Sequence, residues 1–318
     1  MGNVNPRKVA MIGCGFVGSA SCFALMNSGL FSEMVLIDAN QAKAEGEAMD
    51  ISHGLPFARP MNIYAGTYDD IADAAIIIVS AGAAQAPGET RLDLVKKNIK
   101  IFGFIMPELK KRDIGGILVI VANPVDVLTY AAIQMSGLPE NRVFGTGTVL
   151  DTARLKTMIG DYVGVDSRNC HAYVVGEHGD SEIVAWSSAK ISGLPLDDYC
   201  MLKDLNDHKE QKQQIAERVK NSAYEIIERK GATYYGIAMS VKRVCEAIIR
   251  DEKTVLPVSH LQHGEYGVKD VAMSTPALVG INGIEGEIPI DLSMDEQEKL
   301  LDSARTLRDV LDDAMPKD

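Results

Sequence analysis

The feature that most restricts the fold of this sequence is a glycine-rich turn directly after an apolar run near the N-terminus. Residues 8–12 are mostly apolar, as expected of a strand that is covered on both faces. Gly13-Cys14-Gly15-Phe16-Val17-Gly18 follows at once and has the spacing G-x-G-x-x-G. Such a turn lets backbone N–H groups approach a pyrophosphate at the N-terminus of a helix. The motif therefore predicts a dinucleotide site formed by Gly13, Gly15 and Gly18, with Phe16 and Val17 between them.

An acidic residue follows the glycine motif at the distance that such a site needs. A second apolar run covers residues 34–38 and ends in Asp38, 20 residues after Gly18. A carboxylate there can hold the ribose hydroxyl groups of an adenosine, and it would repel a 2′-phosphate. NAD is therefore favoured over NADP as the cofactor. The alternative is a purely structural glycine-rich turn in another α/β protein.

Apolar runs alternate with amphipathic stretches throughout the first half of the chain. The runs at 75–79, 116–121 and 142–144 are predicted to be buried strands. Residues 91–111 form the clearest helix, because apolar residues recur three and four positions apart. Pro107 is expected to kink this helix or to weaken its last turns. The alternation predicts an α/β fold with a doubly wound parallel sheet of the Rossmann type.

The pattern changes after Gly147, where short strands and long polar helices predict an α+β substrate domain. We therefore divide the chain into residues 1–146, the dinucleotide-binding domain, and 147–318, the catalytic domain. The elements expected in the second domain are strands at 169–175, 182–187, 254–260 and 268–279, and helices at 204–229, 234–250 and 295–312.

Composition excludes several classes of function. A formal net charge of −12 argues against non-specific binding to nucleic acid or to an anionic membrane, because both need a cationic surface. An anionic small ligand must therefore meet positive charge that is concentrated locally. The five cysteines have no paired spacing, and the apolar N-terminal run is broken by glycines. A reducing, cytoplasmic location is expected, with no membrane segment.

Several polar residues stand where a doubly wound sheet binds its ligands, at the carboxyl ends of strands. Asn123 closes one strand, and the polar segment 82–91 follows another, although it could be only a solvated connection. Asp151 and Arg154 lie three residues apart on an expected helix and could form only an exposed ion pair. His178 differs from the other histidines because glycines flank it and leave room for a substrate.

His260 and His263 have a spacing that could suggest metal ligands. No acidic residue or cysteine completes a convincing ligand set with them. We therefore expect no metal site, and we expect both histidines at the surface or at an interface.

Three motifs follow the dinucleotide fingerprint. They are Asn123-Pro124-Val125-Asp126, Asp151-Thr152-Ala153-Arg154 and Gly176-Glu177-His178-Gly179-Asp180. With these motifs the chain resembles the L-lactate/malate dehydrogenase family over essentially its whole length. The segment from Ala83 to Arg91 is similar to the lactate branch in particular. The resemblance implies reversible hydride transfer between NADH and pyruvate, giving L-lactate.

The resemblance also implies roles for individual residues. His178 would donate and accept a proton, Asp151 would orient it, and Arg154 would clamp the substrate carboxylate. Arg91 would polarise the carbonyl group when its loop closes. The other implied contacts are those of Asn123, Gln85 and Thr233 with the substrate, and those of Asn123 and Ile237 with the nicotinamide.

The chemistry needs these residue types independently of any resemblance. Hydride transfer to a 2-oxo acid develops negative charge on the carbonyl oxygen, and an imidazole can protonate that oxygen near neutral pH. A guanidinium binds a carboxylate through two parallel hydrogen bonds. A non-enzymatic nucleotide-binding protein of the same fold should have lost at least one of these residues, but all are present.

A malate dehydrogenase is the nearest alternative within the family. Its substrate has a second carboxylate, and the position that matches Gln85 is typically an arginine in that branch. Here Gln85 is neutral and Glu89 adds negative charge. Enclosing an unpaired carboxylate is unfavourable, so a dicarboxylate should be a poor substrate.

The resemblance raises a question of regulation. Some bacterial members are activated by fructose 1,6-bisphosphate, bound between subunits by an arginine and a histidine. The matching residues here are Lys156 and His171. Lysine keeps the charge but lacks the planar fork of arginine, and His171 could be only a structural contact. The family also implies a homo-oligomer, taken here as a tetramer, that acts in glycolysis and fermentation.

Overall fold

The structure is a computed structural model that describes residues 4–83, 88 and 90–315, without the side chain of Arg91. Strands and helices alternate through the first half, and the second half mixes short strands, long helices and an antiparallel meander. The strands are β1 (Asn5–Ile12), β2 (Glu33–Ile37), β3 (Asn62–Ala65), β4 (Ala74–Val79), β5 (Ile117–Ile120), β6 (Val143–Gly145), β7 (Cys170–His171), β8 (Val174–Val175), β9 (Ile183–Val184), β10 (Lys190–Ile191), β11 (Leu194–Pro195), β12 (Thr254–His263), β13 (Lys269–Gly280) and β14 (Gly283–Glu287).

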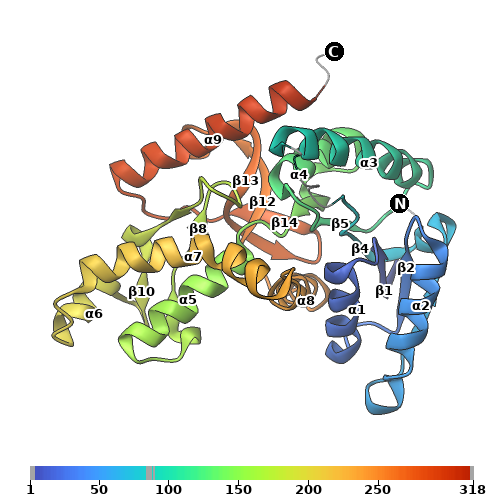
Figure 1. Ribbon diagram of the computed structural model, residues 1–318, viewed down its shortest axis with the longest axis horizontal. Helices are drawn as coiled ribbons and strands as arrows, with labels where there is room; N and C mark the ends of the chain where they lie inside the picture. Colours follow the sequence, from blue (N-terminus) through green and yellow to red (C-terminus); the bar gives the residue numbers. More distant parts are fainter. Residues whose placement is uncertain (1–3, 84–87, 89, 316–318) are drawn as a thin grey trace.

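A nine-stranded sheet runs through the described part of the molecule in the order β14-β13-β12-β6-β5-β4-β1-β2-β3 (Figure 1). Its six N-terminal strands are parallel and have the order 3-2-1-4-5-6, which is that of a dinucleotide-binding Rossmann sheet. The predicted fold class is therefore confirmed. The antiparallel strands of the second half extend this sheet from β6, where Ser259 pairs with Gly145.

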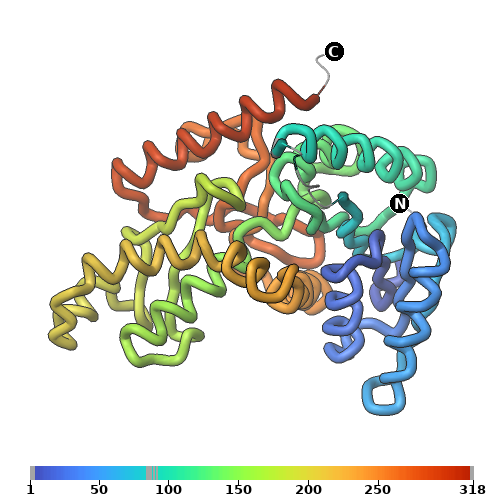
Figure 2. Tube along the Cα trace, in the orientation of Figure 1, coloured from blue at the N-terminus to red at the C-terminus, as the bar shows by residue number. Residues whose placement is uncertain are grey.

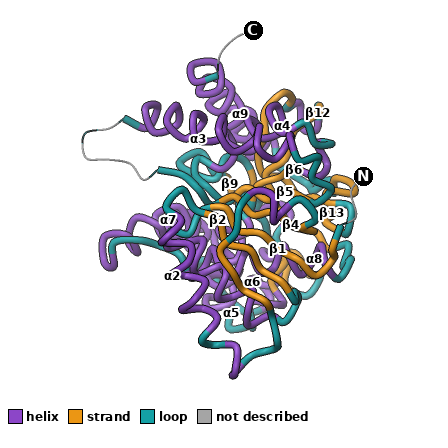
Figure 3. Tube along the Cα trace, turned by 90° about the vertical axis from the view of Figure 1, so that its right-hand side faces the viewer, coloured by secondary structure: helices purple, strands orange, loops and turns teal. Residues whose placement is uncertain are grey.

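The helices cover both faces of the sheet (Figure 3). Helices from distant parts of the sequence lie side by side, α1 against α8 and α3 against α9 (Figure 2). No helix within the described ranges combines the length and apolar character that a membrane span needs. The helices are α1 (Phe16–Ser28), α2 (Gln41–Ser52), α3 (Arg91–Lys111), α4 (Val125–Ser136), α5 (Val149–Val163), α6 (Leu196–Leu202), α7 (His208–Lys230), α8 (Tyr235–Ile249) and α9 (Met294–Ala314).

Alternate residues of the central strands enter two separate apolar cores. In β4 all six residues are buried. Ile77 and Val79 face the core that contains residues of α3, α4 and α9, whereas Ile76 and Ile78 face the core of α1, α2 and α8. Successive side chains of a strand point to opposite faces, so only a near-continuous apolar run can fill both cores. This is why these strands could be found in the sequence.

The predicted elements differ from the structure mainly at edges. Strands β3 and β14 were not predicted, because they lie at the two ends of the sheet and are mostly only partly buried. The stretch 169–175 forms two strands, β7 and β8, in different small sheets. Helix α3 has the predicted bounds and continues through Pro107 to Lys111.

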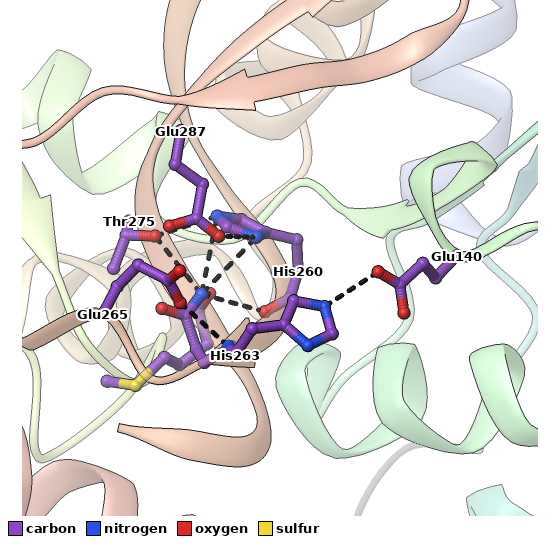
Figure 4. Close-up of polar contacts among 8 residues, drawn as sticks. Glu140, His260, His263, Glu265, Thr275 and Glu287 are labelled. Atoms are coloured by element: carbon purple, nitrogen blue, oxygen red, sulfur yellow. Dashed lines mark hydrogen bonds and ion pairs between the residues drawn. The ribbon is translucent and has the colours of Figure 1, made fainter. Parts of the chain in front are cut away.

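The expectation that His260 lies at the surface or an interface is wrong for the described chain. His260 is 4% exposed, since β12 is an inner strand of the sheet. Its Nε2 lies 2.8 Å from Oγ1 of Thr275, and its Nδ1 lies 3.6 Å from Oε1 of Glu287 (Figure 4). His263 is exposed and pairs with Glu140 at 2.8 Å. The sheet therefore contains one enclosed imidazole and one solvated imidazole, three residues apart.

The enclosed imidazole should make folding sensitive to acid. Burial lowers the pKa of His260 to about 4, whereas an imidazole in an unfolded chain titrates near pH 6.5. As the pH falls through this window, the unfolded state binds the proton first, so the stability of the folded state declines. Between pH 7 and pH 5 the loss from this residue should be about 2 kcal/mol.

Urea unfolding of the wild type and of His260→Asn at pH 7 and pH 5 measures this contribution. We expect the variant to lose less stability than the wild type over the interval. His263→Asn, which removes the exposed histidine of the same strand, is the control for the loss of an imidazole. Equal pH dependence in His260→Asn and the wild type would contradict the prediction.

Candidate active site

The three glycines of the turn after β1 differ in the space around them. Gly13 has φ +99°, and a Cβ there would lie 2.4 Å from the backbone nitrogen of Ala81. A Cβ on Gly18 would lie 2.0 Å from the carbonyl oxygen of Gly13. A Cβ on Gly15 would meet no described atom within 4 Å. Gly13 and Gly18 are therefore required for packing, whereas Gly15 leaves open space for a ligand.

The N-terminus of α1 faces this open space, and its first backbone N–H groups have no capping side chain. No side chain caps the helix at Gly15, and its first turn, which begins at Phe16, has no acidic residue. The free N–H groups and the helix dipole therefore favour an anion there. Cavities of about 650 and 510 Å³ meet at Gly15, which lines both, and Lys43 is also common to both. This arrangement fits the pyrophosphate of a dinucleotide.

Asp38 stands at the wall of the larger cavity, directly after β2. Its Oδ2 accepts a hydrogen bond of 2.7 Å from the N–H of Cys14, and its Oδ1 accepts one of 2.9 Å from the N–H of Asn40. The backbone thus fixes the carboxylate beside the glycine turn. Each carboxylate oxygen has a further lone pair that could accept from a ribose hydroxyl group. The geometry fits the adenosine ribose of NAD.

Asn98 is a structural residue of the site that the sequence reasoning missed. It lies on α3, fully buried, and its Oδ1 accepts a hydrogen bond of 2.8 Å from the N–H of Ala83. Its Nδ2 donates one of 2.8 Å to the carbonyl oxygen of Asn123. The segments that follow β4 and β5 are thereby joined. The available signal was an amide side chain next to Ile99 on the apolar face of the helix.

The three polar motifs, on α4, on α5 and in the loop after β8, meet around the carboxylate of Asp151. Its Oδ2 lies 2.6 Å from Nδ1 of His178, and its Oδ1 accepts a hydrogen bond of 2.8 Å from Nη1 of Arg154. Asp151 is 2% exposed. The N–H of His178 donates to Oδ2 of Asp126, on α4, at 2.7 Å. Residues from α4, α5 and the loop after β8 thus form one cluster.

Charge pairing decides the protonation states in this cluster. Burial disfavours the charged form of His178, but the charge of Asp151 and the hydrogen bond to it outweigh burial and raise the pKa of His178 to about 9. The pKa of Asp151 is lowered, because the charges of His178 and Arg154 outweigh the effect of its burial. At neutral pH the cluster therefore contains an imidazolium, a guanidinium and an ionised carboxylate between them. It can donate a proton and attract an anion.

One group of described residues has the spacing of a possible metal site. Single ligand atoms of Asp151, His178 and Glu182 lie within 4.8 Å of one another. Both oxygens of Asp151 are already engaged by His178 and Arg154, and the positive charges of those partners oppose a bound cation. The arrangement fits an anion better than a metal ion.

The start of α8 contributes Tyr234 and Tyr235 to the lining of the smaller cavity. The ring of Tyr234 stacks on Phe16 of the glycine turn with centroids 5.5 Å apart, and Thr233 directly precedes Tyr234 in the chain. Ile237 packs against the same apolar core as Val17. The second half of the chain therefore helps to close the site of the first.

Other predicted site residues lie elsewhere or outside the described part of the chain. Gln85 is outside the described residues, and Arg91 is described only as the first residue of α3. Lys156 and His171 line a separate cavity of about 510 Å³ together with Arg168 and Arg243.

Comparison with known proteins agrees with this geometry. The lactate/malate dehydrogenase NAD binding domain matches residues 7–145, and the alpha/beta C-terminal domain of the same family matches residues 148–317. The chain belongs to the lactate/malate dehydrogenase family. It is an oxidoreductase that uses NAD, and the cofactor predicted from the glycine turn and Asp38 is confirmed.

Curated and solved relatives cover nearly the whole chain. L-lactate dehydrogenase 1 of Clostridium acetobutylicum is 50% identical over 305 residues, which are 96% of this chain and 97% of that protein. The L-lactate dehydrogenase of Acetivibrio thermocellus is also 50% identical, over 96% of each chain. The crystal structure of the minor L-lactate dehydrogenase from Enterococcus mundtii, in its ligands-bound form, has a TM-score of 0.94 at 44% identity. It covers 98% of this chain and 99% of that chain.

The geometry predicts that two variants separate proton transfer from cofactor binding. His178→Asn removes the proton donor but leaves the glycine turn intact, so turnover should fall by about 10²–10⁴-fold with nearly unchanged affinity for NADH. Asp38→Ala should raise KM for NADH much more than it lowers kcat. Steady-state kinetics and NADH fluorescence titration measure both effects. If His178→Asn lost NADH affinity as strongly as turnover, His178 would be a structural residue instead.

Proposed function

We propose that this protein is an NAD-dependent L-lactate dehydrogenase, which interconverts pyruvate and L-lactate. The observation that carries the proposal is the cluster of His178, Asp151 and Arg154 beside a dinucleotide cleft, in a chain 50% identical to curated L-lactate dehydrogenases. Bound NADH supplies the hydride for carbon 2 of the 2-oxo acid. The chain itself must supply the proton, hold the carboxylate and fix the orientation of the substrate.

Each residue of the cluster has one task in this proposal. His178 gives its proton to the carbonyl oxygen of pyruvate as negative charge develops there, and it takes a proton back from L-lactate in the reverse direction. Asp151 orients the imidazole and favours its charged form. Arg154 has five N–H donors, of which Asp151 engages one among the described contacts. The other donors can bind the substrate carboxylate, with two parallel hydrogen bonds.

The other residues complete the proposed site. Arg91, the first residue of α3, is assigned the task of polarising the carbonyl group through the likeness to the family. Gln85 is included as a substrate-binding residue only through the likeness to the family. Asn123 helps to hold the carbonyl oxygen and contacts the nicotinamide, Thr233 lines the substrate pocket, and Ile237 packs against the nicotinamide. We place the boundary of the two domains between residues 146 and 147.

The proposal includes the setting of the enzyme. All five cysteines are buried and free of disulfides, as expected in a reducing compartment, and this supports a cytoplasmic location. A homotetramer that acts in glycolysis and fermentation is part of the same proposal, through the likeness to the family.

The substrate is tested by comparing pyruvate with oxaloacetate at equal concentration, with the rate of NADH oxidation as the readout. We expect kcat/KM for pyruvate to exceed that for oxaloacetate by orders of magnitude, because a second carboxylate would be enclosed without a cation. A preference for oxaloacetate would contradict the proposal and indicate a malate dehydrogenase.

We also propose that the cavity around Lys156 and His171 is a weak anion site. Of its other basic residues, Arg168 is paired with Asp166 and Arg243 with Glu252, so less positive charge is available than the four side chains suggest. Burial lowers the pKa of Lys156. The alternative is that His171 is a structural residue at a subunit contact.

Pyruvate saturation curves at low ionic strength, with and without fructose 1,6-bisphosphate, measure this site. We expect weak activation that needs a high effector concentration and disappears at high salt, since screening weakens such contacts. Strong activation at micromolar effector would show that Lys156 replaces an arginine fully. No activation at any concentration would leave Lys156 and His171 with structural roles.

A further inference from the structure

A second acidic side chain approaches the catalytic cluster without taking part in its hydrogen bonds. Glu182 stands immediately before β9, four residues after His178. One of its carboxyl oxygens lies within 4.8 Å of both an oxygen of Asp151 and a ring nitrogen of His178. Its Oε1 is enclosed and accepts no hydrogen bond from the described residues. The proposed mechanism uses no feature of this group.

An enclosed carboxyl group without donors is more stable with its proton. Burial, followed by the negative charge of Asp151, raises the pKa of Glu182 to about 8, although the positive charges of His178, Arg154 and Lys220 oppose this shift. Lys220 faces the group from α7, and the other three lie on α5 and the catalytic loop. Glu182 is therefore neutral at pH 7 and becomes ionised in mildly alkaline solution.

Ionisation of Glu182 would change the charge of the site where the substrate anion binds. Pyruvate must bring its carboxylate to Arg154 in the proposed function. A negative charge on Glu182 competes for the same positive groups and repels that carboxylate. Asp126 faces His178 from α4, and burial raises its pKa to about 6. It is therefore ionised throughout the alkaline range and adds no titration there.

We propose that Glu182 is a positioning residue that must hold a proton for the 2-oxo acid to bind, so that its ionisation excludes the substrate. The inference rests on the proposed function, because it assumes that Arg154 receives the substrate carboxylate. Two groups then oppose pyruvate binding when they lose a proton, His178 and Glu182. Thermodynamic linkage also requires that a bound 2-oxo acid raises the pKa of Glu182.

The pH profile of kcat/KM for pyruvate distinguishes one ionisation from two. Above pH 9, log(kcat/KM) of the wild type should approach a loss of two decades per pH unit. Glu182→Gln cannot ionise, so its profile should approach one decade per unit. The difference should appear in KM for pyruvate, with KM for NADH unchanged. A merely structural role of Glu182 would not change the limiting slope.

Two further variants make the test specific. Glu182→Asp keeps an ionisable group, so its log(kcat/KM) should still approach a loss of two decades per pH unit. The pH at which the ionisation of residue 182 takes effect should be shifted. Glu217→Gln removes the same charge from an exposed position on α7 and should keep the wild-type profile. These controls separate ionisation near His178 from a general loss of negative charge.

The outcomes are distinguishable. The role of Glu182 would be overturned if log(kcat/KM) of the wild type approached a loss of only one decade per pH unit. Equal limiting slopes in the wild type and Glu182→Gln would overturn it as well. If Glu182→Gln failed to fold, the wild-type limit and the shifted step of Glu182→Asp would still decide the question. A chain that reduced no pyruvate at any pH would contradict the proposed function itself.

Discussion

The charge of Asp151 is the constraint on which the arrangement of this site depends. An ionised carboxylate that is 2% exposed is tolerated only when positive partners and hydrogen bonds replace water. Here His178 and Arg154 each engage one of its oxygens. This pairing fixes the imidazole, keeps it protonated at neutral pH and holds a guanidinium beside it. Stability and proposed chemistry thus come from the same contacts, and the loss of either partner would leave the buried carboxylate with a single positive partner.

The parallel sheet explains how distant motifs meet at this carboxylate. The carboxyl ends of β1, β4 and β5 lie along one edge, and the close approach of Gly13 to Ala81 joins the first two. Asn98 then joins the segments after β4 and β5. Asp126 continues the chain of contacts to the backbone of His178. The cofactor cleft and the catalytic cluster are therefore adjacent because of strand order and a few buried hydrogen bonds.

Much of the first half could be predicted, since buried parallel strands need apolar runs and a tight strand-to-helix turn needs glycine. Both signals are local, and they identified β1, β2, β4 and β5 together with Asp38. Edge strands give no such signal, because solvent replaces part of the apolar environment, so β3 and β14 were missed. His260 was misplaced for a related reason. Whether a polar strand residue is enclosed depends on the strands beside it, here β13 and β6.

The sequence by itself determined the class of the sheet, the glycine-rich turn after the first strand, the acidic residue after the second strand and the residue types of the three polar motifs. Each of these follows from short-range patterns of apolarity, glycine or spacing. Only the tertiary structure decided which charges meet, that Asn98 joins two loops, and that Glu182 lies enclosed beside Asp151 and His178. Burial and charge pairing depend on segments far apart in the chain. The protonation state of each group is therefore a property of the folded arrangement and cannot be read from the residue alone.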